Sequence, residues 1–259
     1  MRNVEKYIGV FDSGVGGLTV VKSLLEKLPN ENIVYLGDSK HMPYGDKTNE
    51  QIIKYVMDDV KFLNTYELKA IVIACNTADS IASNDIRKAY DIPVYGVIDP
   101  TAKQAANTTQ NNKIGVIATS AAIKSNVYEK SIAKYNMRAK VISQACPFLV
   151  PLIEEGKFDI GNQEMRYILE DYLSPLIEEG IDTLILGCTH YDLLIEIIKD
   201  MYPTLNIVSS SRYIADIVKK EIELNNNNHS EQLYFTSSDK NRFNEIASMF
   251  MKDVEAKEI

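Results

Sequence analysis

The sequence predicts an α/β protein made of two similar halves, each a parallel sheet flanked by helices. Apolar runs of strand length alternate with helical patterns, which is typical of parallel sheets covered by helices. Two of these runs, at residues 70–74 and 183–187, are each followed by a cysteine and then by small hydrogen-bonding residues. Residues 8–13 and 114–119 form a second matching pair. Both repeats favour a duplicated unit.

The expected strands are short, nearly continuous apolar runs, as in strands that are buried on both faces. We expect them at residues 7–11, 33–37, 70–74, 93–97, 114–118, 140–144, 183–187, 206–209 and 233–236. Between them, a helical pattern runs over Leu18–Leu28 and ends at Pro29, which cannot continue a helix. Further helical patterns cover Asn49–Asn64 and Glu164–Glu179.

The stretch Asp99–Asn112, with its polar run Asn107–Asn112, leads from the fourth strand into the repeat of the first, and we place a domain crossing there. A return crossing is expected near Val208–Arg212, followed by a helix, the polar loop Asn225–Asn228, a strand and a last helix. The predicted domains are therefore residues 1–98 plus 209–259, and residues 99–208. Related halves of this kind can face one another across a cleft, where we expect the active site.

Composition narrows the class of protein. The 259 residues are 45% apolar and 25% charged, with a formal net charge of −8 and scattered Lys and Arg. Nucleic acids and anionic membranes are therefore poor partners, and no apolar run reaches the roughly 18 to 20 residues that span a bilayer. Three cysteines, an odd number, argue against a disulfide framework. We expect the protein to be cytoplasmic. We also expect no metal, because no Cys or His spacing indicates a zinc site.

The glycine-rich segment Asp12–Gly17 follows the first strand and opens a helix. Its backbone N–H groups can approach an anion, and we favour a substrate carboxylate. A dinucleotide is an alternative because Asp38 ends the second strand, but Thr19 stands where the third glycine of that fingerprint belongs. A purely structural turn is the remaining alternative.

Cys75 and Cys188 are the candidate acid/base groups, because each follows a buried strand in a similar context. A single buried cysteine is more often a small packing residue, as we expect for Cys146. His190 strengthens the case for Cys188, since an imidazole can activate a thiol. His41 and His229 have no catalytic context.

Four separated motifs together resemble glutamate racemase, and their order and spacing agree over almost the entire chain. They are Asp12–Val20, Pro43–Gly45, Ala74–Ala78 and Gly187–Tyr191. The resemblance implies a cofactor-independent amino-acid racemase of bacterial cell-wall (peptidoglycan) synthesis, with glutamate as its small-molecule substrate. It also implies two α/β domains and a homodimer.

The resemblance also assigns roles to residues. The two acid/base thiols correspond to Cys75 and Cys188, and the assisting residues to Asp12, Glu154 and His190. Substrate contacts correspond to Asp12, Ser13, Tyr44, Gly45, Asn76, Thr77, Thr119, Thr189 and His190.

Two positions depart from the pattern of the family. Ala122 replaces a frequent threonine and removes a hydroxyl donor, and Asp79 stands where a small residue is usual. Two alternatives stay open: an aspartate racemase of the same superfamily, and an amino-acid-binding protein that does no chemistry.

Overall fold

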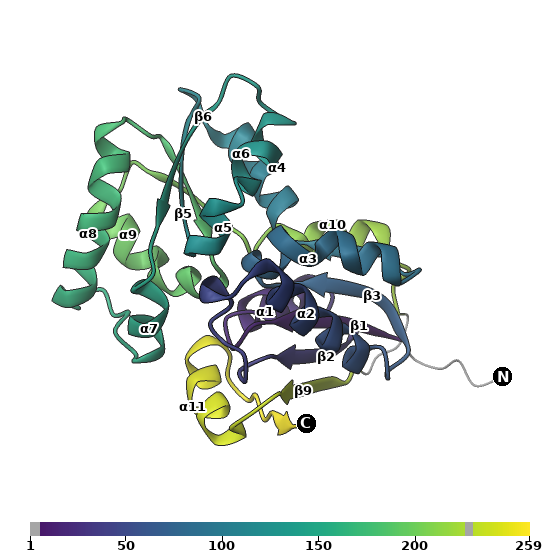
Figure 1. The fold of residues 1–259 in the computed structure, drawn as a ribbon. Helices are drawn as coiled ribbons and strands as arrows, with labels where there is room; N and C mark the ends of the chain where they lie inside the picture. Colours follow the sequence, from purple (N-terminus) through teal and green to yellow (C-terminus); the bar gives the residue numbers. More distant parts are fainter. Residues whose placement is uncertain (1–5, 226–229) are drawn as a thin grey trace. The chain divides into compact units, whose positions relative to one another are not determined.

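The structure of the protein is a computed structural model that describes residues 6–225 and 230–259 (Figure 1). His229 and most of the predicted polar loop lie outside these ranges. The chain divides into two compact units. One comprises the described residues up to Val97 together with those from Ser211 onward, and the other comprises Ile98–Ser210.

The first unit contains a six-stranded parallel sheet in the order β10-β9-β2-β1-β3-β4. The central strand β1 pairs with β2 on one side and with β3 on the other, so that Val10 lies opposite both Tyr35 and Val72. The strands are β1 (Tyr7–Asp12), β2 (Asn32–Gly37), β3 (Leu68–Ile73), β4 (Val94–Gly96), β9 (Gln232–Thr236) and β10 (Lys257–Glu258).

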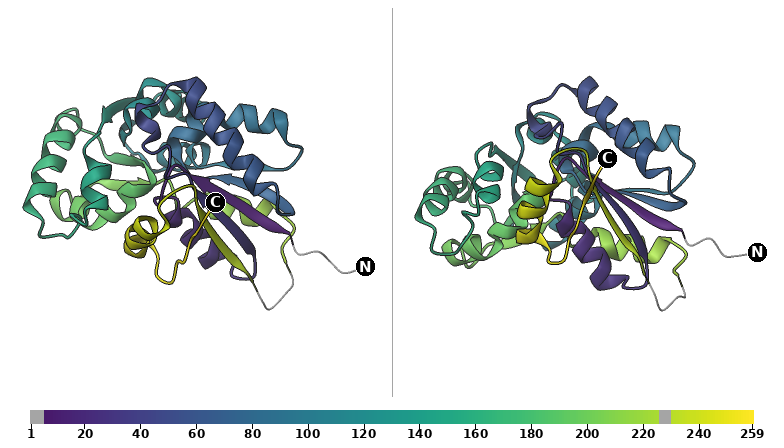
Figure 2. Two further views of the ribbon diagram at one scale, coloured as in Figure 1. Left: turned by 60° about the horizontal axis from the view of Figure 1, so that its bottom comes forward. Right: turned by 90° about the horizontal axis from the view of Figure 1, so that it is seen from below.

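Helices cover both faces of this sheet. The right-hand view of Figure 2 shows α2 (Asn49–Leu63) and α3 (Asn76–Ala89) on one side, and α1 (Leu18–Lys27) and α10 (Ile214–Glu221) on the other. The last helix is α11 (Lys240–Phe250), and a short 3₁₀ turn, η1 (Tyr44–Asp46), follows β2. The sheet is therefore buried on both faces, which explains the continuous apolar runs of its strands.

The second unit contains a four-stranded parallel sheet in the order β6-β5-β7-β8. Its strands are β5 (Lys113–Ala118), β6 (Lys140–Ala145), β7 (Thr183–Gly187) and β8 (Asn206–Ser209). Figure 1 shows α4 (Ile98–Thr108) and α6 (Val127–Ala133) on one side and α8 (Gln163–Glu178) and α9 (Ile195–Met201) on the other. The shorter elements are α5 (Ser120–Lys124), α7 (Leu149–Glu154) and the 3₁₀ turn η2 (Thr189–Leu194).

The two sheets share one topology. The order β4-β3-β1-β2 in the first unit matches β8-β7-β5-β6 in the second, with β1 equivalent to β5 and β3 to β7. Even a packing detail repeats, because Gly9 in β1 and Gly115 in β5 both lie close to leucine side chains. The predicted duplication and the α/β fold class are confirmed.

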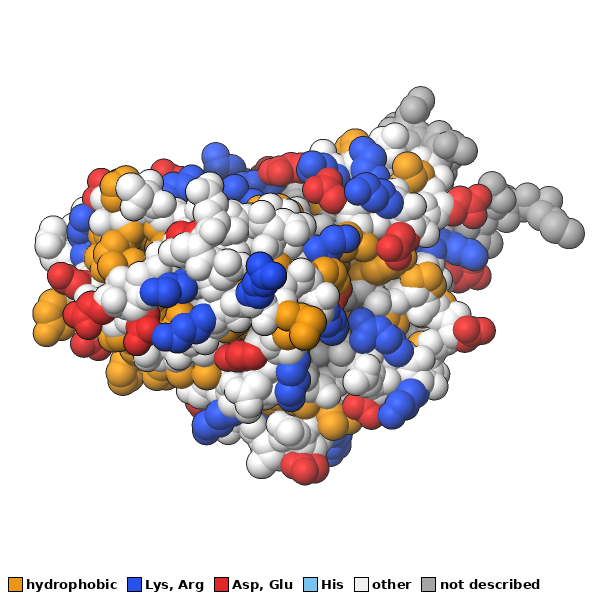
Figure 3. All heavy atoms as spheres, turned by 90° about the horizontal axis from the view of Figure 1, so that it is seen from above, with side chains coloured by type: hydrophobic (Ala, Val, Ile, Leu, Met, Phe, Trp, Pro, Cys, Tyr) orange, Lys and Arg blue, Asp and Glu red, His pale blue; other side chains and the backbone are white. Residues whose placement is uncertain are grey.

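Charges of both signs alternate over the face drawn in Figure 3. Within residues 6–225 and 230–259, no helix has both the length and the apolar character required to cross a bilayer.

Candidate active site

In each unit the topology creates a switch point between two inner strands of the sheet. The chain leaves the central strand toward one neighbour and later returns on the other side, so the connections after β1 and β3 diverge, as do those after β5 and β7. Ligands bind at such switch points, outside the carboxyl ends of the strands. The predicted site residues form one group per unit, and most of them lie at the switch points; the exceptions are Tyr44 and Gly45, which follow β2, and Glu154, which ends α7.

Cys75 lies at the switch point of the first unit, between the end of β3 and the start of α3. Its sulfur accepts a hydrogen bond from the Ala78 N–H at 3.5 Å and lies 3.5 Å from Ser13 Oγ. Only 5% of the residue is exposed. Burial, and then the charge of Asp12, raise the pKa of the Cys75 thiol, so the neutral thiol is favoured in the protein without substrate.

Asp12 ends β1 and organises the glycine-rich loop. Its carboxylate accepts hydrogen bonds from the Ser13 N–H at 2.8 Å and from the Gly17 N–H. Gly17 has no room for a side chain, because an added Cβ would lie 2.6 Å from Asp12 Cβ and 3.0 Å from Ala74 Cβ. One N–H group of the predicted anion site is thus occupied by Asp12. The loop holds Ser13 beside the Cys75 sulfur.

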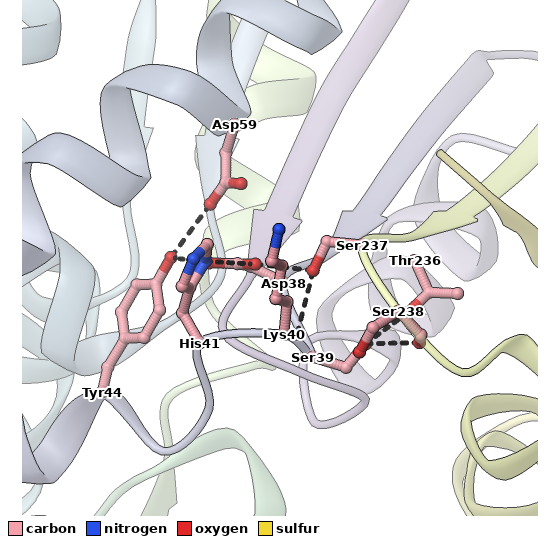
Figure 4. A network of polar contacts seen from close by, with 9 residues as sticks. All are labelled: Asp38, Ser39, Lys40, His41, Tyr44, Asp59, Thr236, Ser237 and Ser238. Atoms are coloured by element: carbon pink, nitrogen blue, oxygen red, sulfur yellow. Dashed lines mark hydrogen bonds and ion pairs between the residues drawn. The ribbon is translucent and has the colours of Figure 1, made fainter.

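Tyr44 and Gly45 come from the η1 turn after β2. The Tyr44 side chain is buried, and its hydroxyl lies 2.7 Å from Asp38 Oδ2 and 3.0 Å from Asp59 Oδ2 (Figure 4). Burial, followed by the charges of Asp59 and Asp38, raises the pKa of Tyr44, which keeps the phenol neutral. Asn76 and Thr77, also buried, are the first two residues of α3.

Cys188 lies at the switch point of the second unit, immediately after β7, and is 8% exposed. Its sulfur lies 3.9 Å from His190 Nδ1, and His190 Nε2 lies 2.9 Å from Glu154 Oε1 at the end of α7. Burial by itself lowers the pKa of His190, but the hydrogen bonds to Cys188 and Glu154 outweigh it and raise this pKa to about 10. At neutral pH, His190 is therefore an imidazolium between two groups that can carry negative charge.

The remaining predicted contacts surround the second switch point. Thr119 follows β5 and caps α5, where its hydroxyl accepts a hydrogen bond from the Ala122 N–H at 3.4 Å. Ala122 is buried, so the position that departs from the family still carries a backbone role. Thr189 is buried at the start of η2, beside Cys188.

Two further residues singled out in the sequence, Cys146 and Asp79, are also buried. Cys146 is buried and its Sγ lies 3.6 Å from the Gln144 carbonyl oxygen. The Asp79 carboxylate, from α3, fills the space that a Cβ on Gly96 would occupy. In the described part of the chain, no group of three or more His, Cys, Asp or Glu side chains is arranged to hold a metal ion.

Comparison with known proteins gives the family. Residues 8–213 match the sequence model of the family described as Asp/Glu/Hydantoin racemase. The chain belongs to this family. Its relatives include the glutamate racemase of a Sulfurihydrogenibium species, which is 43% identical over 253 residues, covering 97% of this chain and 96% of the relative.

Solved structures agree with this assignment. A glutamate racemase isoform from Bacillus anthracis has a TM-score of 0.93 at 38% identity, covering 99% of this chain and 98% of the other. A glutamate racemase from Francisella tularensis, solved in complex with D-glutamate, has a TM-score of 0.90 at 35% identity, covering 98% and 97%. The predicted resemblance is confirmed, and this member of the racemase family is an isomerase that acts on amino acids.

Sequence reasoning missed the partners of Tyr44, above all Asp59. The signal was present, because Asp59 lies on the apolar stripe of α2 formed by Ile52, Val56 and Leu63. An acidic residue on a buried helix face needs a specific partner.

Proposed function

We propose that this family member interconverts L-glutamate and D-glutamate without a cofactor, by a two-base mechanism in which one of Cys75 and Cys188 removes the α-proton and the other delivers a proton, and supplies D-glutamate for peptidoglycan synthesis. The observation that carries the proposal is one cysteine at the switch point of each of two equivalent units, with an imidazolium beside one of them. Glutamate as the substrate is supported by the names of the relatives and by the D-glutamate bound to the Francisella tularensis protein.

The two thiols have different surroundings, which suit them to different acid and base roles. Burial and Asp12 favour a neutral Cys75, whereas the positive charge of His190 attracts a negative Cys188 sulfur. We propose that, in the form that accepts L-glutamate, Cys188 acts as the base and Cys75 as the acid. The resemblance to the family implies that Cys188 removes the α-proton of L-glutamate, and Cys75 then delivers a proton to the opposite face.

Each turnover exchanges the roles of the two cysteines. After one turnover Cys75 is the thiolate and Cys188 is the thiol, which is the form that accepts D-glutamate. The proposal requires both sulfurs to reach opposite faces of one α-carbon in the complex. Loss of a proton from Cys188 to solvent and uptake of a proton by Cys75 restore the form that accepts L-glutamate, and Glu154 favours this by keeping His190 positive through the hydrogen bond at 2.9 Å.

Acid/base catalysis by the thiols supplies only part of the rate. A positioned acid or base contributes roughly a hundredfold to ten-thousandfold, which is too little for so weak a carbon acid. Fixed donors must stabilise the negative charge that spreads onto the α-carboxylate. We propose that the hydroxyls of Ser13, Thr77, Thr119 and Thr189 do so together with neighbouring backbone N–H groups.

The test measures racemisation of each glutamate enantiomer by wild type, C75S and C188S. We expect wild type to racemise glutamate and both variants to lose nearly all of this activity, because a serine hydroxyl is a far weaker acid than a thiol. Racemisation at an ordinary rate by either variant contradicts the role of that cysteine. Racemisation of aspartate but not glutamate overturns the substrate, and binding of glutamate without α-proton exchange in wild type overturns the enzyme proposal.

The cytoplasmic location, the homodimer and the predicted domain boundaries stay predictions. Light scattering on the purified chain checks the homodimer directly.

A further inference from the structure

A buried polar cluster supports the turn that carries Tyr44 and Gly45. Figure 4 shows Asp38, after β2, with His41 and Tyr44 on one side and Ser237 on the other. The Tyr44 hydroxyl lies 2.7 Å from its Oδ2, the Ser237 hydroxyl 2.6 Å from its Oδ1, and His41 Nδ1 2.8 Å from its Oδ2. All three can donate, so Asp38 is satisfied as an ionised carboxylate that accepts from each of them.

Asp59 reaches the same hydroxyl from the opposite side. Its Oδ2 lies 3.0 Å from Tyr44 Oη, and the residue is 6% exposed on the buried face of α2. A tyrosine has one hydroxyl hydrogen, which cannot serve two ionised carboxylates. The shorter contact gives this hydrogen to Asp38, so the contact with Asp59 needs a proton on Asp59.

We propose that Asp59 is a protonated carboxylic acid at neutral pH and acts as a positioning residue, donating its hydrogen bond to Tyr44 and fixing the η1 turn. The link from this turn to glutamate rests on the proposed function, but the protonation of Asp59 does not. A chain of donors then runs from Asp59 through Tyr44 to Asp38, and each hydrogen in it has one acceptor.

The electrostatic surroundings favour this arrangement. The titratable groups that face Asp59 are Asp38 from the end of β2, Asp12 from the end of β1, Tyr44 from η1 and Asp58 on its own helix. Three of these four are acids, and His41, the neighbouring base, is bonded to Asp38 and stacked on a tyrosine of α2. Burial, followed by the charge of Asp38, raises the pKa of Asp59 well above its ordinary value.

The proposal predicts how stability depends on pH. In the unfolded chain Asp59 loses its proton at about pH 4, whereas in the folded protein Asp59 keeps this proton at neutral pH. The folded state then binds more protons than the unfolded state, so this residue lowers stability progressively as the pH rises above about 4. D59N removes the titrating group but keeps an N–H donor for Tyr44.

The first experiment compares urea unfolding midpoints of wild type and D59N from pH 4.5 to 8. We expect the midpoint of D59N to rise relative to wild type as the pH increases. D91N is the matched control, because Asp91 is an exposed aspartate of the same unit and is not among the groups that face Asp59; its difference from wild type should stay constant. A D59N difference that is equally constant, or a loss of stability in D59N at pH 7, overturns the proposal.

The second experiment separates positioning from mere packing by kinetics. D59N should keep the KM for glutamate within about twofold of wild type, whereas D59A, which removes the donor, should raise it about tenfold, equivalent to about 1.4 kcal/mol. An infrared difference spectrum of wild type minus D59N at pH 7 should show the C=O band of a protonated carboxyl. Equal KM values for D59N and D59A, or the absence of that band, contradict the proposal. A protein with the expected stability pattern that racemises neither enantiomer supports a protonated Asp59 and contradicts the proposed function.

Discussion

The hydrogen bond between Glu154 and His190 gives the sharpest quantitative prediction. His190 is held as an imidazolium by two partners, Cys188 at 3.9 Å and Glu154 at 2.9 Å, with a pKa of about 10. E154Q keeps the shape of the side chain and removes its charge. A hydrogen bond to a charged group contributes about 1.5 to 3 kcal/mol, and one pKa unit corresponds to about 1.4 kcal/mol. We therefore expect the pKa of His190 in E154Q to fall by about one to two units, to about 8 to 9.

The free energy lost with the hydrogen bond between Glu154 and His190 should also lower the rate of catalysis. If Glu154 keeps His190 positive beside the Cys188 thiolate, its loss should lower kcat from L-glutamate by roughly tenfold to a hundredfold. The stabilisation from the charged His190 is fully present below about pH 6.5 and disappears as the pH rises through about 10. In E154Q it should disappear at about pH 8 to 9, and the activity should decline over the same range.

The assay is a titration of imidazole resonances by nuclear magnetic resonance. The chain has three histidines, so H41N and H229N assign the resonance of His190 by elimination. E155Q is the matched control, since Glu155 is the next residue and is exposed. A wild-type His190 that titrates near its ordinary value of about 6.5, or an unchanged titration in E154Q, would refute the reasoning.

Two further predictions follow from the same geometry. Iodoacetamide at pH 7 should modify Cys188 at least tenfold faster than Cys75, because the thiolate is the reactive form and burial together with Asp12 keeps Cys75 neutral. Peptide mass spectrometry measures which cysteine is modified first. Faster modification of Cys75 would contradict the prediction. G17A should lower the free energy of unfolding by about 1 to 3 kcal/mol, since the new Cβ meets Asp12 and Ala74, whereas G161A, with nothing within 4 Å, should change it little in urea unfolding. Equal effects of the two glycine substitutions would show that the loop accommodates a side chain.

Most of the fold could be predicted because its strands are buried on both faces. The run expected at residues 183–187 is the observed β7, and the helix expected over Asn49–Asn64 ends one residue earlier as α2. The strand β10, only Lys257–Glu258, was missed. Both of its residues are exposed, so it has no apolar pattern, and its pairing with β9 comes from tertiary structure alone.

The site could be predicted only in part, for a physical reason. Cys75 and Cys188 could be found because a strand end is visible in a local apolar pattern. The family resemblance named His190 and Glu154 as assisting residues, but their hydrogen bond, between residues 36 apart, appears only in the structure, since no local pattern encodes it. The protonation of Asp59 follows from the single hydroxyl hydrogen of Tyr44, which lies between two carboxylates. This arrangement exists only in the folded protein, where η1, the end of β2 and α2 come together.

The most direct test of the two-thiol account is the isotope content of both enantiomers at early conversion in heavy water. Starting from L-glutamate, the D-glutamate formed should carry solvent deuterium at Cα, while the remaining L-glutamate keeps its proton, because the group that removes the proton is not the group that delivers the new one. D-glutamate that retains the original α-proton would contradict the account, since it would show that one group serves both faces of the carbon.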